Sequence, residues 1–125
     1  MLFLFLDGVG LGQPDPATNP FVTAELPTLR GLLGGQALLA GTPATETERS
    51  LFIPTDANLG VGGPPQSATG QANILTGLNV PQTIGAHWGP KPNPAVAALL
   101  RSDNLFLRLT QRGQTAALLN AYPQR

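Results

Sequence analysis

The sequence predicts an α/β protein with a parallel sheet, and three observations support this prediction. Residues 1–6, "MLFLFL", form an unbroken apolar run, which is typical of a strand covered on both faces in a parallel sheet. Strand-like and helix-like segments then alternate along the chain, as they do where helices connect parallel strands. Glycine and proline are abundant, with 15 and 13 residues, so many positions must lie in loops between these segments.

The segments of the first half are short. Residues 26–34 predict a helix, because Pro27 suits the first turn of a helix and Gly34 suits its end. Residues 36–41 and 49–56 predict two strands, and the polar segment between them predicts a turn. The first half is therefore expected to supply strands to the sheet and one covering helix.

The second half predicts more helix. Residues 67–77 and 94–112 are helical in pattern, the latter as two pieces of which Ser102 or Asp103 caps the second. The segment between these two regions is rich in glycine and proline and predicts a long loop. Residues 115–121 predict the last strand. A chain rarely stops just after a buried parallel strand, so we expect all 125 residues to be the N-terminal portion of one longer domain.

Charge and composition exclude several classes of protein. Seven basic and seven acidic residues give no net charge, which argues against nucleic acid or an anionic membrane surface as a partner. Without cysteine, the chain forms no disulfide and no zinc–thiolate site. The N-terminal apolar run is too short for a signal peptide and follows no basic segment, so we expect a cytoplasmic protein that does not contact membranes. The oligomeric state stays open.

Asp7 follows the first predicted strand and opens the segment "DGVGLG". Ligands of open α/β sheets bind at the carboxyl ends of the strands, where Asp7 is expected. The glycines at 8, 10 and 12 do not fit a dinucleotide-binding fingerprint, because the third comes one residue early and "QPDPATNP" forbids the helix that should follow. A carboxylate held at a strand end suits a hard divalent cation. A cap of the turn is the alternative role of Asp7.

Ser67 opens the predicted helix of residues 67–77. Its simplest role is that of an N-cap, whose hydroxyl accepts a hydrogen bond from the first turn. A second role is compatible with this position, because helix N-termini favour anions and a metal-activated serine can accept a phosphoryl group. Thr69 is the competing hydroxyl nearby.

Two motifs together resemble the alkaline phosphatase superfamily of metalloenzymes. Asp7-Gly8 follows an apolar strand, and Ser67 stands nine residues before Thr76-Gly77, an offset at which sulfatases and nucleotide pyrophosphatases place their nucleophile. "QSATGQ" is similar to the Asn-Ser-x-x-Gly-His segment of cofactor-independent phosphoglycerate mutases, with glutamine in place of both asparagine and histidine. "NPF" and "LPTLRGLLGG" also resemble the mutase segment that leads into its first helix.

The resemblance implies an alkaline-phosphatase-like α/β core and metal-dependent phosphoryl transfer or hydrolysis, by a phosphomutase or a phosphatase. Asp7 and Ser67 would ligate one of two divalent metal ions, Mn²⁺, Zn²⁺ or Mg²⁺, and Ser67 would be the nucleophile that attacks a small phosphorylated substrate. The residues expected to bind substrate are Gln66, Gln71, His87 and Lys91.

The predicted metal site is incomplete in this sequence. Two metals need further Asp and His ligands, and the chain has one histidine, His87, in the segment "IGAHWGPKPNP". We expect these ligands beyond residue 125, and residues 1–125 alone to be inactive. For His87 a structural role stays open, with its ring hydrogen-bonded and Trp88 packed. A non-catalytic binding module that keeps the scaffold without a full metal site is the alternative function.

Overall fold

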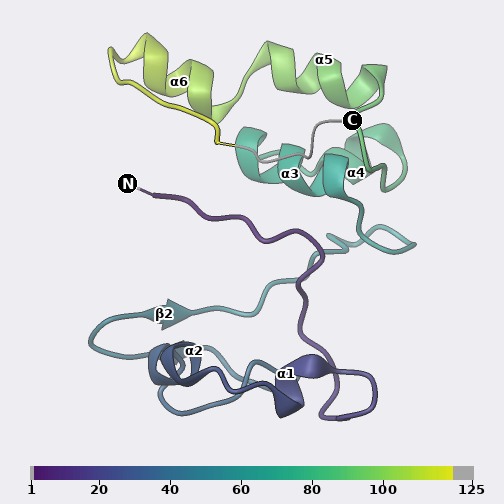
Figure 1. Cartoon of the computed structure of the whole chain (residues 1–125). Coiled ribbons are helices and arrows are strands. Elements are labelled where there is room, and N and C mark those ends of the chain that lie inside the picture. Colours follow the sequence, from purple (N-terminus) through teal and green to yellow (C-terminus); the bar gives the residue numbers. More distant parts are fainter. Residues whose placement is uncertain (1, 120–125) are drawn as a thin grey trace, which may run out of the picture. The chain divides into compact units, whose positions relative to one another are not determined.

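The computed structural model describes residues 2–119 (Figure 1). The chain divides into two compact units, Met1–Asp56 and Ala57–Arg125. Between residues 2 and 119, none of the helices combines the length and the apolar character that a bilayer crossing needs.

The first unit is built from two short helices and one hairpin. Pro27 opens the second helix and Gly34, with a φ of 63°, follows its end, so the helix predicted within residues 26–34 is confirmed. The elements are α1 (Pro20–Thr23), α2 (Pro27–Leu32), β1 (Thr45–Glu46) and β2 (Leu51–Phe52).

The strands of the first unit differ from the prediction. β2 occupies only two residues of the predicted strand 49–56, and it pairs antiparallel with β1, which lies in the segment predicted as a polar turn. Thr45 pairs with Phe52 in this ladder. The segment 36–41 makes a single parallel bridge, between Leu39 and Gly12.

Asn19 organises the loop that follows the first apolar segment. Its side chain is buried, accepts a hydrogen bond from the backbone N–H of Phe21 at 3.1 Å and donates one to the carbonyl of Gln13 at 2.8 Å. A Cβ added at Gly12 would lie 2.9 Å from the Asn19 Nδ2 atom. A larger residue at position 12 would therefore collide with the side chain of the capping residue Asn19.

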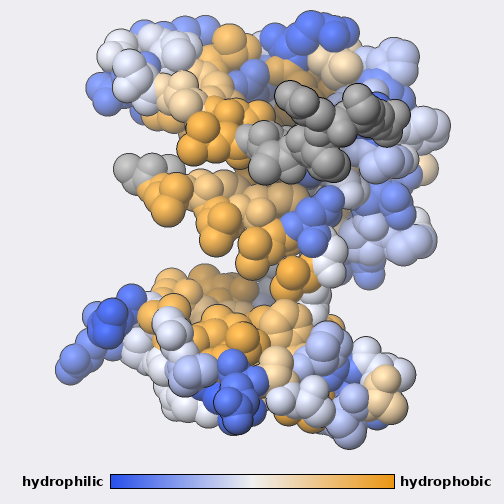
Figure 2. All heavy atoms as spheres, viewed as in Figure 1, coloured by the Kyte–Doolittle hydropathy of each residue, from blue (hydrophilic) through white to orange (hydrophobic). Residues whose placement is uncertain are grey.

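The apolar segment of residues 2–6 makes no ladder pairing within the described part of the chain, and its side chains are exposed (Figure 2). Leu2 is 89% exposed. Residues 115–119 of the predicted last strand are likewise without strand pairing among residues 2–119, and residues 120 and 121 lie outside the described residues. The predicted parallel sheet therefore stays a prediction.

The second unit is helical in its described part. Its core consists of Ala72, Val80 and Val96, all fully buried, with partly buried side chains of α4 and α5 packed against them. Its helices are α3 (Ser67–Thr76), α4 (Val80–Ile84), α5 (Pro94–Ser102) and α6 (Leu105–Gln111). α3, α5 and α6 confirm the helices predicted within 67–77 and 94–112.

α4 was missed, because the segment that contains it was predicted as a loop. Asn79 caps it by accepting a hydrogen bond from the backbone N–H of Gln82 at 3.2 Å, and Pro81 lies in its first turn. Asparagine followed by proline in this register is a helix-start signal. The high local content of glycine and proline concealed that signal.

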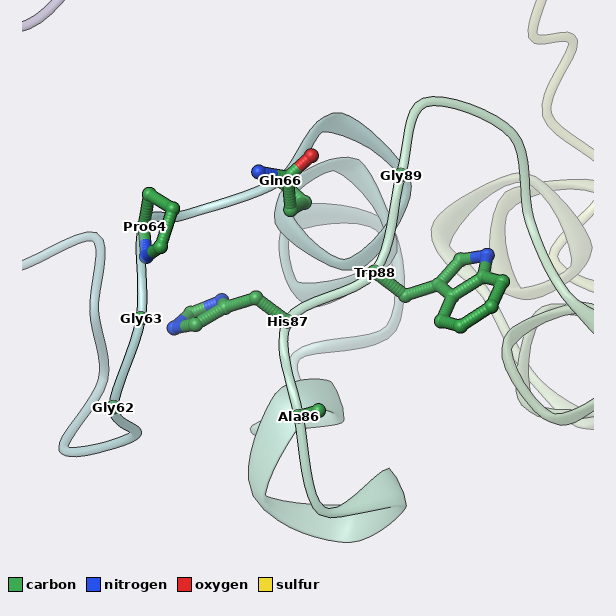
Figure 3. A pocket seen from close by; sticks show the side chains of 8 residues that line it. All are labelled: Gly62, Gly63, Pro64, Gln66, Ala86, His87, Trp88 and Gly89. Atoms are coloured by element: carbon green, nitrogen blue, oxygen red, sulfur yellow. The ribbon is translucent and has the colours of Figure 1, made fainter.

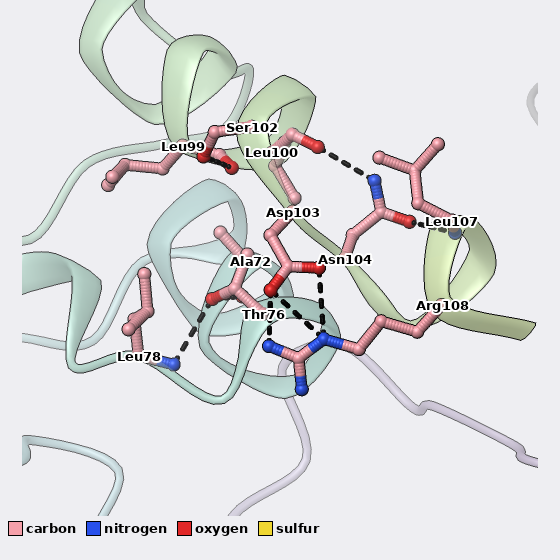
Figure 4. Close-up of polar contacts among 10 residues, drawn as sticks. All are labelled: Ala72, Thr76, Leu78, Leu99, Leu100, Ser102, Asp103, Asn104, Leu107 and Arg108. Carbon is pink, nitrogen blue, oxygen red and sulfur yellow. Dashed lines mark hydrogen bonds and ion pairs between the residues drawn. The ribbon is translucent and has the colours of Figure 1, made fainter. Parts of the chain in front are cut away.

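Asn104 is the N-cap of α6, so the prediction that Ser102 or Asp103 caps it is wrong. Its Oδ1 atom accepts a hydrogen bond from the backbone N–H of Leu107 at 3.0 Å, and its Nδ2 atom donates one to the carbonyl of Leu100 at 2.7 Å (Figure 4). One side chain thus joins the end of α5 to the start of α6.

The two residues that were predicted as caps have other partners. Ser102 donates its hydroxyl hydrogen to the carbonyl of Leu99 at 2.8 Å. Asp103 forms an ion pair with Arg108, whose guanidinium holds the pKa of the Asp103 carboxyl below its usual value (Figure 4). Both groups are exposed, so this ion pair contributes little to stability.

Replacement of the cap tests this assignment. We expect Asn104→Ala to lower the free energy of unfolding by about 0.5–2 kcal/mol, because α6 loses its capping acceptor. Ser102→Ala is the matched control and should change stability by less than about 0.5 kcal/mol, as is usual for exposed positions. Denaturant unfolding measures both. A larger loss for Ser102→Ala than for Asn104→Ala would contradict the assignment.

Candidate functional site

A hollow of about 260 Å³ opens at the N-terminus of α3, within the second unit (Figure 3). Two stretches of backbone form its walls, one rich in glycine before α3 and one after α4. The residues that line it are Gly62, Gly63, Pro64, Gln66, Ala86, His87, Trp88 and Gly89.

α3 begins beside this hollow, shortly after two prolines. Gln66, which follows Pro65, is extended with φ −126° and ψ 148°, and its carbonyl accepts the first helical hydrogen bond, from the backbone N–H of Gly70 at 2.9 Å. Gln66 therefore occupies the N-cap position, without a capping bond from its side chain. The prediction that Ser67 is the N-cap is wrong, since Ser67 is the first helical residue.

Ser67 lies where the field of α3 favours negative charge. The first-turn N–H groups of a helix carry a partial positive charge, which stabilises a phosphate or a developing oxyanion. Ser67 is partly exposed, and the preceding residue, Gln66, lines the hollow. A serine hydroxyl in this position can meet a small anionic ligand.

Thr69, the competing hydroxyl, is fully buried. Its Oγ1 atom accepts a hydrogen bond from the backbone N–H of Trp88 at 3.2 Å and lies 3.2 Å from the carbonyl oxygen of Gln66, to which it can donate. A hydroxyl without solvent access and with these partners cannot attack a substrate. The structure thus leaves Ser67 as the accessible hydroxyl of the pair.

Gly89 passes directly over the start of α3. A Cβ added to it would lie 3.0 Å from the backbone nitrogen of Ser67 and 3.1 Å from the Oε1 atom of Gln66. Carbon atoms rarely approach so closely, so a side chain at this position requires a shift of the helix or the loop. Gly89 is therefore a close-approach residue that shapes the hollow.

His87 forms the wall opposite Gln66. Its ring extends toward residues 62–64 (Figure 3), and its Nε2 atom lies 3.3 Å from the carbonyl oxygen of Val61. The ring of Trp88 points away from His87, and the residue is 47% exposed, so the expectation that Trp88 is packed is wrong. His87 is thus both hydrogen-bonded, as the structural interpretation expects, and part of the hollow.

Four predicted site residues are not among those that line the hollow: Asp7, Ser67, Gln71 and Lys91. Gln71 lies on α3 one turn beyond Ser67 and is partly exposed. Lys91 is exposed and lies in the same loop, two residues after Gly89. Asp7 is exposed in a turn of the first unit, where Gly8 has a φ of 73°. Of the predicted substrate-binding residues, Gln66 and His87 are the two that line the hollow.

Metal donors are sparse in the described part of the chain. Among residues 2–119, no three His, Cys, Asp or Glu side chains gather where they could hold a metal ion. The predicted ligands Asp7 and Ser67 belong to different units. These residues alone therefore do not fit a centre of two divalent ions, which needs six or more donors.

Comparison of the chain with protein-family models, with curated proteins and with solved structures gives no match. The resemblance to the alkaline phosphatase superfamily therefore continues to rest on the sequence motifs described above.

Two features of the hollow were missed in the sequence. The contact of Thr69 with Trp88 joins residues 19 positions apart, and Gly89 approaches Ser67, which precedes it by 22 positions. The one local signal is that Gly89 stands between a bulky aromatic residue and a proline, which does not reveal its partner.

A pair of glycine variants tests the close approach. We expect Gly89→Ala to destabilise the chain by about 1–3 kcal/mol, the usual cost of overpacking, because its new methyl group meets the α3 backbone. Gly62 also lines the hollow, but a Cβ there meets no atom within 4 Å, so Gly62→Ala is the matched control and should be nearly neutral. Thermal and denaturant unfolding measure the difference. Equal stability of both variants would contradict the assignment.

Proposed function

We propose that the chain belongs to a metal-dependent enzyme that transfers or hydrolyses a phosphoryl ester through Ser67. One observation carries the proposal: Ser67 is the first residue of the ten-residue helix α3, and the residue before it lines an open hollow. The motif resemblance implies a serine nucleophile at residue 67, and Ser67 lies at a helix N-terminus, where an anionic phosphoryl group is stabilised. The two lines of argument therefore agree. A cytoplasmic enzyme with a small phosphorylated substrate is part of this proposal.

In the proposed reaction the Ser67 Oγ atom attacks phosphorus in line with the leaving oxygen. The bond from phosphorus to the leaving oxygen breaks as the bond to Oγ forms and Oγ loses its proton, which gives a phosphoserine and an alkoxide that takes up a proton to leave as an alcohol. Water then removes the phosphoryl group in a phosphatase, and a second substrate hydroxyl removes it in a mutase. The N-terminal end of α3 stabilises the charge on the phosphoryl oxygens in both steps.

The proposal includes two divalent ions, which would supply Lewis-acid stabilisation of the oxygens and would activate the serine. Asp7 and Ser67 are the ligands proposed in this chain, and residues 2–119 do not provide a complete donor set. Residues 1–125 alone are therefore proposed to be inactive. Gln66 and His87 would contact the substrate from the walls of the hollow, and Gln71 and Lys91 from beyond them.

The alternative proposal is a non-catalytic module that binds a small polar ligand. The sparse metal donors of the described residues favour it, since the hollow itself is formed without them. Covalent chemistry at Ser67 distinguishes the two proposals.

The proposed shared metal predicts that Asp7 and Ser67 lie close together. Oxygens bound to one ion at 2.0–2.6 Å are within roughly 5 Å of each other. Because the chain has no cysteine, the double variant Asp7→Cys/Ser67→Cys contains one thiol pair. We expect this pair to form a disulfide, or to react with a short dithiol crosslinker, in the folded protein. Mass spectrometry under non-reducing conditions detects the link.

Asp15→Cys/Ser67→Cys is the control. Asp15 also lies in the first unit but is not a proposed metal ligand, because its carboxylate accepts hydrogen bonds within its own turn, from the backbone N–H of Ala17 and the hydroxyl of Thr18. Failure of the Asp7→Cys/Ser67→Cys pair to link, or equal linking of both pairs, would rule out a metal ion shared by Asp7 and Ser67.

Replacement of Ser67 tests the nucleophile. In the protein from its complete reading frame, with Mn²⁺ and para-nitrophenyl phosphate, Ser67→Ala should lower turnover by several orders of magnitude, because the covalent step is lost. Ser67→Thr keeps a hydroxyl and should retain part of the activity. Acid quenching during turnover should trap one phosphate on Ser67, located by mass spectrometry.

Ser102→Ala, at the end of α5, is the control and should leave turnover unchanged. A folded Ser67→Ala protein with near-normal turnover would refute the nucleophile. Absence of turnover and of trapped phosphate in the unmodified protein, together with saturable ligand binding at the hollow, would favour the binding module.

A further inference from the structure

We infer that Thr69 is a positioning residue, which fixes the loop of residues 85–91 against the first turn of α3 and so holds Gly89 beside Ser67 and His87 in the wall of the hollow. The catalytic part of this inference rests on the proposed function. The structural part does not, because it concerns contacts that form without substrate.

Thr69 and Trp88 pair through both backbone and side chain. The backbone N–H of Thr69 donates to the carbonyl of Trp88 at 3.0 Å, and the backbone N–H of Trp88 donates to the Thr69 Oγ1 atom at 3.2 Å. The Thr69 hydroxyl hydrogen is directed to the carbonyl of Gln66 at 3.2 Å or to that of Trp88 at 3.3 Å. This Thr69–Trp88 contact links the start of α3 to the loop. The side chain that makes it, Thr69, is fully buried.

Its hydroxyl has a use that helix formation does not explain. A threonine within a helix commonly bonds a carbonyl three or four residues before it, as Thr76 does with Ala72 at 2.7 Å, and the other partner of the Thr76 hydroxyl, the N–H of Leu78, is only two residues away. Thr69 in addition receives the N–H of a residue 19 positions later. Removal of the hydroxyl would leave this part-buried N–H without the acceptor that it has in the structure.

The contact fixes both neighbours of Trp88 in the wall of the hollow. On one side His87 reaches the carbonyl of Val61 at 3.3 Å and so connects the loop to the glycine-rich wall. On the other side Gly89 lies so near the start of α3 that an added Cβ would be 3.0 Å from the backbone nitrogen of Ser67. Because His87 and Gly89 are the chain neighbours of Trp88, a shift of the Trp88 backbone would move them and alter the surroundings of Ser67.

The experiment compares Thr69→Val, Thr69→Ser and Thr76→Val by hydrogen–deuterium exchange of the protein from its complete reading frame. Valine keeps the shape of threonine without the hydroxyl, and serine keeps the hydroxyl. Thr76→Val is the matched control, because Thr76 is also buried in α3 but its hydroxyl bonds Ala72 and Leu78, away from the loop (Figure 4).

We expect the Trp88 amide to be protected in the unmodified protein and to exchange about tenfold faster in Thr69→Val, while α5 keeps its protection. Thr69→Ser should restore protection, and Thr76→Val should not release the loop. A rapidly exchanging Trp88 amide in the unmodified protein would overturn the inference even if Thr69→Val fails to fold. Unchanged exchange in a folded Thr69→Val would also overturn it.

Turnover of para-nitrophenyl phosphate with Mn²⁺ tests the catalytic part. Thr69→Val should lower kcat by about 10- to 100-fold, with a smaller change in KM, because displacement of the groups around a nucleophile costs that much. Thr69→Ser should recover most of kcat. A released loop with normal kcat would refute the positioning role. No turnover in the unmodified protein refutes the proposed function instead, and the exchange result alone then decides whether Thr69 positions the loop.

Discussion

The packing of Ala72, Val80 and Val96 against one another is the interaction on which the second unit depends. These side chains come from α3, α4 and α5 and are fully buried. Burial of each valine contributes about 1.5–3 kcal/mol, and few other side chains of this unit are as well covered. α3 is therefore held by a small core at its middle, and its first turn needs polar contacts of its own to stay fixed.

Those polar contacts surround the hollow. Thr69 binds the loop after α4, His87 binds the backbone before α3, and Gly89 lies against the start of the helix. The three interactions make the walls of one site from segments that are separate in sequence. The small size of the core explains why the site relies on hydrogen bonds and on a missing side chain rather than on bulky apolar packing.

The same arrangement gives the hydroxyls of Ser67 and Thr69 different environments, which the sequence does not reveal. Thr69 is buried and engaged with the loop, whereas Ser67 is partly exposed at the N-terminal end of α3. A phosphoryl group would meet the helix field at Ser67, and this agreement between motif and position supports the proposed function. The metal donors would have to come largely from outside the described residues.

The sequence by itself determined the helices at 27–32, 67–76, 94–102 and 105–111, because proline at a helix start, glycine after a helix end and apolar periodicity are local signals. It did not determine the β1–β2 pairing or the cap at Asn104, where several polar residues compete over a few positions. Only the tertiary structure decided the contact of Thr69 with Trp88 and the close approach of Gly89 to the start of α3. Their partners lie about twenty residues away, and no local propensity encodes which distant backbone group a buried hydroxyl will meet.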